Sequence, residues 1–126
     1  MMVNDPSVVA EVAAVFARYE AALVANDLAV LDELFLDSEL TIRYGIAENL
    51  YGSAAIREFR RLRPLAGPGR HLVQTVITSY GSDTAVVSTL FHNDSAPGKV
   101  GRQMQTWIRM PDGWRVAAAH VSVIDD

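Results

Sequence analysis

Apolar residues in the first part of the chain recur at spacings of three and four, which is the period of one helix face. The stripe runs from Val8 to Leu23. An aspartate–proline pair precedes it, and aspartate caps free N–H groups while proline fits a first turn. This pattern predicts one amphipathic helix of about five turns. Asn26 and Asp27 end it and begin a short second helix over residues 28–35, whose leucines form one stripe.

The period then changes from helix to strand. Residues 40–44 alternate with period two, and residues 49–51 are a second short extended piece. A glycine follows each piece, so together they predict a small hairpin. Ser53 is expected to be the N-cap of a third helix over residues 54–63, which ends before Pro64.

The chain after the proline- and glycine-rich loop at residues 64–69 has the pattern of strands. Four long strands separated by short turns predict an antiparallel meander over residues 71–80, 84–93, 100–110 and 114–124. The sheet must curl over the first helix to cover its apolar stripe. We therefore predict a single α+β domain over residues 1–126. A curved antiparallel sheet wraps around a long N-terminal helix and, with two shorter helices, forms a cone with an internal pocket.

Composition and charge narrow the classes of partner. The chain has 126 residues, a formal net charge of −4 and no cysteine. The negative charge disfavours nucleic acids and anionic membranes as partners, and the absence of cysteine excludes disulfides, thiolate nucleophiles and cysteine-ligated metals. There is no signal-peptide pattern and no apolar run of about 18 residues, so we expect a cytoplasmic protein that does not enter a membrane.

Two residues are the main candidates for chemistry. Arg43 lies in a short apolar alternation whose inward positions should face the core, where a guanidinium needs a carboxylate or an anionic ligand. The alternatives are an outward-facing arginine or a structural pair with Glu48. Tyr19 lies on the apolar stripe of the first helix, either as ordinary core or with its hydroxyl projecting into the cone. A nearby guanidinium would favour the phenolate, which suits a general acid or base.

Polar side chains on the strands are candidates for binding. Gln103, Gln105 and Trp107 share one face of the third long strand, and side-chain amides suit a urea or carbamate group. The alternative is solvent exposure near a sheet edge. His120 lies in an alanine- and valine-rich run of the last strand, where it is either a satisfied structural residue or a hydrogen-bond donor in the pocket.

Two other polar patterns in the sequence do not indicate a functional site. His71, His92 and His120 lie on different predicted strands without metal-ligand spacing, so we expect no metal and no cofactor. A local basic cluster is interpreted as a solvated helix face, and its members are Arg57, Arg60, Arg61, Arg63 and Arg70.

The element order, with Ala25-Asn26-Asp27 after the first helix and Asp-Gly-Trp-Arg-Val at 112–116, resembles the nuclear-transport-factor-two-like superfamily of SnoaL-like or cystatin-like cones. Within it, the chain resembles the AtzH-like family, which includes oxalurate-catabolism HpxZ-like proteins and the small protein of bacterial cyanuric acid degradation. The strings that carry this resemblance are RYG at 43–45, ENLYG at 48–52, GRQMQTW at 101–107 and AAHVS at 118–122.

The resemblance implies a pocket inside the cone and, in the cyanuric acid branch, a decarboxylating amide hydrolysis of 1,3-dicarboxyurea to allophanate. In that branch a tyrosine of the first helix and an arginine of the first strand carry the reaction. The positions that match them in this sequence are Tyr19 and Arg43.

We therefore predict a small cofactor-free hydrolase acting on an anionic, carboxylated urea in bacterial nitrogen catabolism. Arg43 would bind and polarise the substrate, and Tyr19 would move the proton. The pocket would be shaped by Gln103, Gln105, Trp107 and His120. The alternative is a non-catalytic ligand-binding or assembly protein that accompanies an amidase, because this superfamily holds both kinds. Apolar residues on the outer face of the meander predict a homodimer.

Overall fold

The computed structural model describes residues 1–64 and 69–126, so most of the loop expected at 64–69 lies outside the described residues. The helices are α1 (Pro6–Ala25), α2 (Leu28–Leu34) and α3 (Ser53–Leu62). The strands are β1 (Ile42–Tyr44), β2 (Asn49–Tyr51), β3 (Arg70–Tyr80), β4 (Thr84–Asn93), β5 (Lys99–Met110) and β6 (Gly113–Asp125). The predicted α+β class and order of elements are confirmed.

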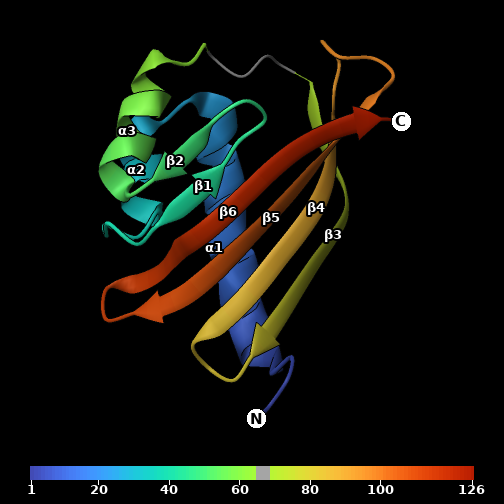
Figure 1. Cartoon of the computed structure of the whole chain (residues 1–126). Coiled ribbons are helices and arrows are strands. Elements are labelled where there is room, and N and C mark those ends of the chain that lie inside the picture. The colour runs from blue at the N-terminus through green and yellow to red at the C-terminus, as the bar shows by residue number, and fades with distance from the viewer. Residues whose placement is uncertain (65–68) are drawn as a thin grey trace.

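The described strands form one six-stranded sheet in the order β2-β1-β6-β5-β4-β3. Neighbouring strands are antiparallel except β1 and β6, which pair in parallel and so join the hairpin to the meander. The sheet curves around α1, and the hairpin, α2 and α3 lie together at one side of it (Figure 1). This arrangement is the predicted cone.

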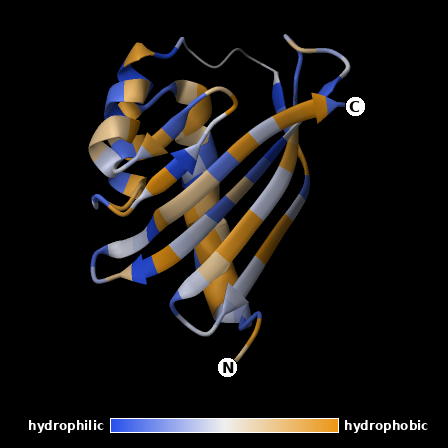
Figure 2. Cartoon of the chain, viewed as in Figure 1, coloured by the Kyte–Doolittle hydropathy of each residue, from blue (hydrophilic) through white to orange (hydrophobic). Residues whose placement is uncertain are grey.

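The first helix begins and ends as its sequence predicts. The Asp5 side chain accepts a hydrogen bond from the Ser7 N–H at 3.0 Å, and Asn26 closes the helix in the left-handed region at φ 54°. The buried face consists of Val8, Val12, Phe16, Tyr19 and Ala22. Apolar segments of α1 lie behind strands along which apolar and polar residues alternate (Figure 2). Within residues 1–64 and 69–126, none of the helices combines the length and apolar character needed to span a bilayer.

The start of α3 differs from the prediction. The N-cap is Gly52 rather than Ser53, and its φ of 89° is a conformation that favours glycine. Ser53 is the first helical residue, and its hydroxyl donates to the Asp37 carboxylate at 2.9 Å instead of capping the helix. The reason is tertiary, because the Gly52 N–H donates to the Thr41 carbonyl at 2.7 Å and thereby ties the helix start to the hairpin.

Strand register assigns side chains to the two faces of the sheet, because successive residues point to opposite sides. One row of paired positions on the inward face is Arg43, Ala119, Gln105, Val87 and Ile77. The neighbouring row on the outer face is Tyr44, His120, Met104, Ser88 and Val76. Met104 and Val76 are each 54% exposed, so this outer face keeps large apolar side chains in contact with water.

Candidate functional site

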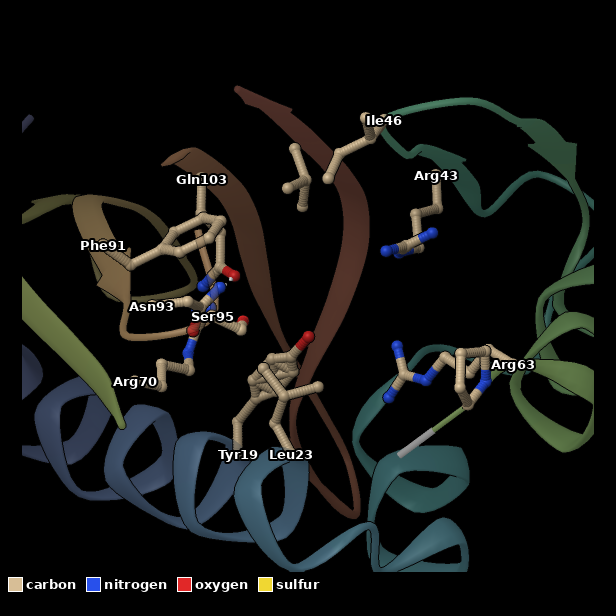
Figure 3. A pocket seen from close by; sticks show the side chains of 12 residues that line it. Tyr19, Leu23, Arg43, Ile46, Arg63, Arg70, Phe91, Asn93, Ser95 and Gln103 are labelled. Carbon is tan, nitrogen blue, oxygen red and sulfur yellow. Dashed lines mark hydrogen bonds between the residues drawn. The ribbon is translucent and has the colours of Figure 1, made fainter. Parts of the chain in front are cut away.

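A cavity of about 230 Å³ opens where α1, β1 and the end of α3 come close to β3, β4 and β5. Leu23, Ile46 and Phe91 supply part of its apolar wall. Its polar lining includes Tyr19 from α1, Arg43 from β1, Arg63 after α3, Arg70 from β3 and Gln103 from β5 (Figure 3). The cavity therefore brings together residues that are far apart in the sequence, and three of them carry a guanidinium group.

Tyr19 is held in place by its ring. The ring centroid lies 6.1 Å from that of Phe35 and 6.2 Å from that of Trp107, the latter edge-on at 77°. The residue is only 6% exposed, and its hydroxyl points into the cavity (Figure 3). Packing fixes the ring and leaves the hydroxyl facing any molecule that enters.

Arg43 both lines the cavity and pairs with Glu48, two arrangements that the sequence left open as alternatives. Its side chain lines the cavity, and its Nη1 also donates to Glu48 Oε1 at 2.8 Å. The guanidinium carbon lies 5.5 Å from the centroid of the Phe59 ring. A Cβ at Gly45 would clash with the Glu48 carboxylate and come within 2.8 Å of Arg43 Nη1, so glycine makes room for the ion pair. The pair orients Arg43 toward the cavity while balancing its charge.

Arg70 belongs to a closed polar network on the opposite wall. Its Nε and Nη2 donate to the two carboxylate oxygens of Glu20 at 2.9 and 3.3 Å, and Nη2 also donates to Gln103 Oε1 at 3.1 Å. The amide nitrogen of Gln103 donates to Glu20 Oε2 at 3.2 Å, and the Arg70 guanidinium lies 4.2 Å from the Phe91 ring centroid. Every member of the network has a partner, so this wall is rigid and its charge is balanced.

Arg63 is the third guanidinium at the cavity. It follows α3 directly, and its backbone N–H donates to the Phe59 carbonyl. Its Nη2 is buried, and no described residue accepts a hydrogen bond from that atom. Burial lowers the pKa of Arg63, and the positive charge of Arg43 lowers it further, whereas Tyr19 and Glu48 act in the opposite direction. Even so, an arginine stays protonated in proteins.

The interpretation of the basic cluster as a solvated helix face is wrong for three of its members. Arg63 and Arg70 line the cavity, and Arg60 is 4% exposed, paired with Asp32 at 3.2 Å. Arg61 is solvated, as expected, and Arg57 is partly so. One signal was present in the sequence, because Arg60 and Arg63 continue at helical spacing the inward stripe of Ile56 and Phe59.

The three candidates on β5 all point inward, yet only one reaches the cavity. Gln103 lines it, whereas Gln105 and Trp107 lie further along the strand inside the core. The Trp107 Nε1–H donates to Gln105 Oε1 at 3.0 Å, so the amide of Gln105 satisfies a buried indole. The solvent-exposed alternative is wrong for all three, since none is more than 3% exposed.

The expectation that His120 shapes the pocket is also corrected. Unbroken alternation from the buried Trp114 would point His120 inward, but the register between β5 and β6 shifts and leaves Ala117 as an extra, unpaired residue. Beyond this bulge Ala119 points inward and His120 points outward. Its ring lies on the outer face of the sheet, 6.3 Å from the ring of Tyr44.

The other two histidines are also apart from the cavity. His71 lies 3.4 Å from Asp94, and His92 lies 3.0 Å from Asp126. In the part of the chain that the structure describes, no group of three histidine or acidic side chains has the geometry to hold a metal ion.

Comparison with known proteins assigns the chain to a family. A family model described as AtzH-like matches residues 1–126. The chain belongs to the AtzH-like family. The resemblance inferred from the sequence strings is thereby confirmed. No protein with a curated description matches this AtzH-like chain.

Solved structures extend the comparison. The AtzH-like chain is similar to a protein of unknown function of the DUF3225 family from Pectobacterium atrosepticum SCRI1043. The identity is 58%, the TM-score is 0.94, and the match covers 98% of this chain and 95% of that one. It is also similar to a cystatin-like fold protein from Burkholderia xenovorans LB400, at 48% identity and a TM-score of 0.97, over 100% of this chain and 98% of that one.

A more distant structure shares the fold. A nuclear transport factor 2 (NTF2-like) superfamily protein from Salmonella enterica serovar Typhimurium LT2 is 24% identical, with a TM-score of 0.75, over 93% of this chain and 91% of that one. The AtzH-like chain therefore has the same fold as this NTF2-like protein.

Proposed function

We propose that this AtzH-like protein is a small hydrolase that acts without metal or cofactor on a carboxylated urea, releasing carbon dioxide. Its substrate would be 1,3-dicarboxyurea or a close relative, and its product allophanate, within bacterial nitrogen catabolism. The observation that carries the proposal is that the Tyr19 hydroxyl and the Arg43 guanidinium, the two residues implied by the family resemblance, face one cationic cavity.

The size and charge of the cavity fit such a substrate. A volume of about 230 Å³ lies below the roughly 300–1,000 Å³ of pockets for drug-sized ligands, which suits a smaller molecule. Guanidinium groups of Arg43, Arg63 and Arg70 face it, and guanidinium matches carboxylate in geometry and charge. The apolar wall lowers the local dielectric constant, which strengthens these electrostatic contacts.

The proposed reaction needs one proton and a place for negative charge. The bond between the N-carboxyl carbon and the urea nitrogen breaks, its electron pair stays on the nitrogen, and the carbon leaves as carbon dioxide. Water then converts the carbon dioxide to bicarbonate, so the overall reaction is a hydrolysis. The nitrogen takes the Tyr19 hydroxyl proton, and the resulting tyrosinate regains a proton from solvent. Arg43 binds the substrate and polarises its carbonyl, which draws electron density away from the breaking bond. The surrounding guanidinium groups stabilise the transient tyrosinate.

A turnover assay tests the proposal. Purified protein is mixed with freshly prepared 1,3-dicarboxyurea, and carbon dioxide and allophanate are measured against the spontaneous rate without protein. We expect catalysed release of both products in equal amounts. If the protein retains the ligand but forms no product above the spontaneous rate, the proposal fails. The chain would then be a ligand-binding partner of an amidase.

A further inference from the structure

The charges around the cavity are unevenly balanced. Arg43 is paired with Glu48 at 2.8 Å, and Arg70 is paired with Glu20 through two hydrogen bonds. Arg63 lies on the wall of the same cavity, and no described carboxylate lies within salt-bridge distance of it. Residues 65–68 are Leu-Ala-Gly-Pro, so they contain no acidic side chain either. The cavity therefore has one guanidinium whose charge the protein does not balance.

An unbalanced charge at this place opposes stability. The Nη2 of Arg63 is shielded from solvent and has no acceptor among the described residues. Burying a cation without a counter-charge is unfavourable, because the protein does not replace the hydration that the cation loses. Such a residue is expected where a ligand supplies the missing charge, because functional sites retain groups that destabilise the empty fold.

The arrangement around Arg63 indicates where an anion would sit. Arg43 and Arg63 approach the cavity from the same wall, and the Tyr19 hydroxyl points into the space they face (Figure 3). Arg70 and Gln103 lie on the opposite wall, already bonded to Glu20. An anion in the cavity thus meets, on the Arg63 side, a guanidinium group that makes no salt bridge with any described residue.

We propose that Arg63 is the residue that binds the carboxylate of the ligand, and that it selects ureas bearing a carboxylate over neutral ureas. Under the proposed function, on which this role rests for its catalytic meaning, the carboxylate retained in the product sits on Arg63. The urea carbonyl then faces Arg43, and the nitrogen to be protonated faces Tyr19. Binding itself can be tested without turnover.

The probe is hydantoate, a stable urea that carries one carboxylate, and its neutral counterpart is N-carbamoylglycinamide. Isothermal titration calorimetry measures both against wild type, Arg63→Gln and the matched control Arg61→Gln. Arg61 lies in the last turn of α3, two residues before Arg63, and is solvated. We expect wild type to prefer hydantoate, Arg63→Gln to bind it at least about tenfold more weakly, and Arg61→Gln to behave as wild type. The neutral urea should bind all three proteins alike.

Thermal unfolding separates ligand binding from a structural role. If Arg63 awaits an anion, the unliganded Arg63→Gln variant melts at or above the wild-type temperature and no longer gains stability from hydantoate. If Arg63 merely stabilises the C-terminal end of α3, the variant melts lower and keeps its hydantoate affinity, which overturns the inference. Wild type that fails to prefer hydantoate overturns it as well.

The binding measurements on Arg63 and the turnover assay can fail separately. Loss of hydantoate affinity in Arg63→Gln, with no product formed by wild type, would keep the anion site and reject the hydrolase. Product formation by wild type, with unchanged affinity in Arg63→Gln, would keep the hydrolase and reject the role of Arg63.

Discussion

Replacing Tyr19 with phenylalanine removes the hydroxyl oxygen and keeps the ring, so the effect on catalysis can be separated from the effect on packing. The ring contacts with Phe35 and Trp107, at centroid distances of 6.1 and 6.2 Å, do not involve the hydroxyl, so the variant keeps them. The hydroxyl itself faces the cavity. We therefore expect the free energy of unfolding to change by less than about 1 kcal/mol. In a domain of this size that corresponds to a melting shift of at most roughly 4 °C.

The rate should respond very differently. A positioned proton donor contributes roughly 10²- to 10⁴-fold to a reaction, so kcat for carbon dioxide release should fall by about that factor. KM should change little, because the guanidinium groups that hold the substrate remain in place. The assay measures initial rates of carbon dioxide release over the spontaneous background, and chemical denaturation of the same preparation gives the stability.

Tyr80→Phe is the matched control, since Tyr80 is 43% exposed at the end of β3 and does not line the cavity. It should leave both rate and stability unchanged. A Tyr19→Phe variant that turns over within about threefold of wild type but loses roughly 1–3 kcal/mol of stability would show a hydroxyl that satisfies a buried group. That result would refute the proton-donor assignment.

Three further changes test other parts of the structure. Arg43→Lys is expected to lose nearly as much turnover as Arg43→Ala, because an ammonium cannot contact Glu48 and a ligand with the planar geometry of a guanidinium; a lysine variant with most of the rate would contradict this. Glu20→Ala leaves the buried Arg70 without its carboxylate, so the free energy of unfolding measured in urea should fall by on the order of 3 kcal/mol. A decrease below about 1 kcal/mol would show that the Glu20–Arg70 pair contributes little to stability. We also expect a homodimer that forms through the outer sheet face, so light scattering should give a mass near twice 13.8 kDa. Met104→Glu should lower this mass, and a wild-type monomer at micromolar concentration would contradict the prediction.

The fold could be predicted from the sequence because its signals are local. The stripe from Val8 to Leu23 needs only helical spacing, and the meander needs only alternation interrupted by turn residues. The parallel pairing of β1 with β6 could not be derived in this way, because it joins segments more than seventy residues apart. The same limit applies to Ser53, whose hydroxyl bonds to Asp37 instead of capping the helix that Ser53 begins.

The candidate site could be predicted only in part, and its errors have one physical cause. Alternation assigns a face correctly as long as the ladder is regular, which holds for Gln103 and Gln105 on β5. A single unpaired residue, Ala117, reverses the faces for the rest of β6 and turns His120 outward. Nothing in the local sequence distinguishes Ala117 from Ala118 and Ala119, which follow it.

The arginines show why the charge of the cavity required the structure. Arg63 and Arg70 look alike in the sequence, since both are single arginines beside the proline- and glycine-rich loop. Their roles differ because Arg70 meets Glu20, fifty residues away, whereas no carboxylate in the described part of the chain lies within salt-bridge distance of Arg63. The family resemblance selects Tyr19 and Arg43, but the net positive charge that would attract an anion comes from Arg63, which makes no salt bridge among the described residues. Supplying a carboxylate beside Arg63 from the protein itself should therefore abolish the preference for anionic ureas, even with Tyr19 and Arg43 intact.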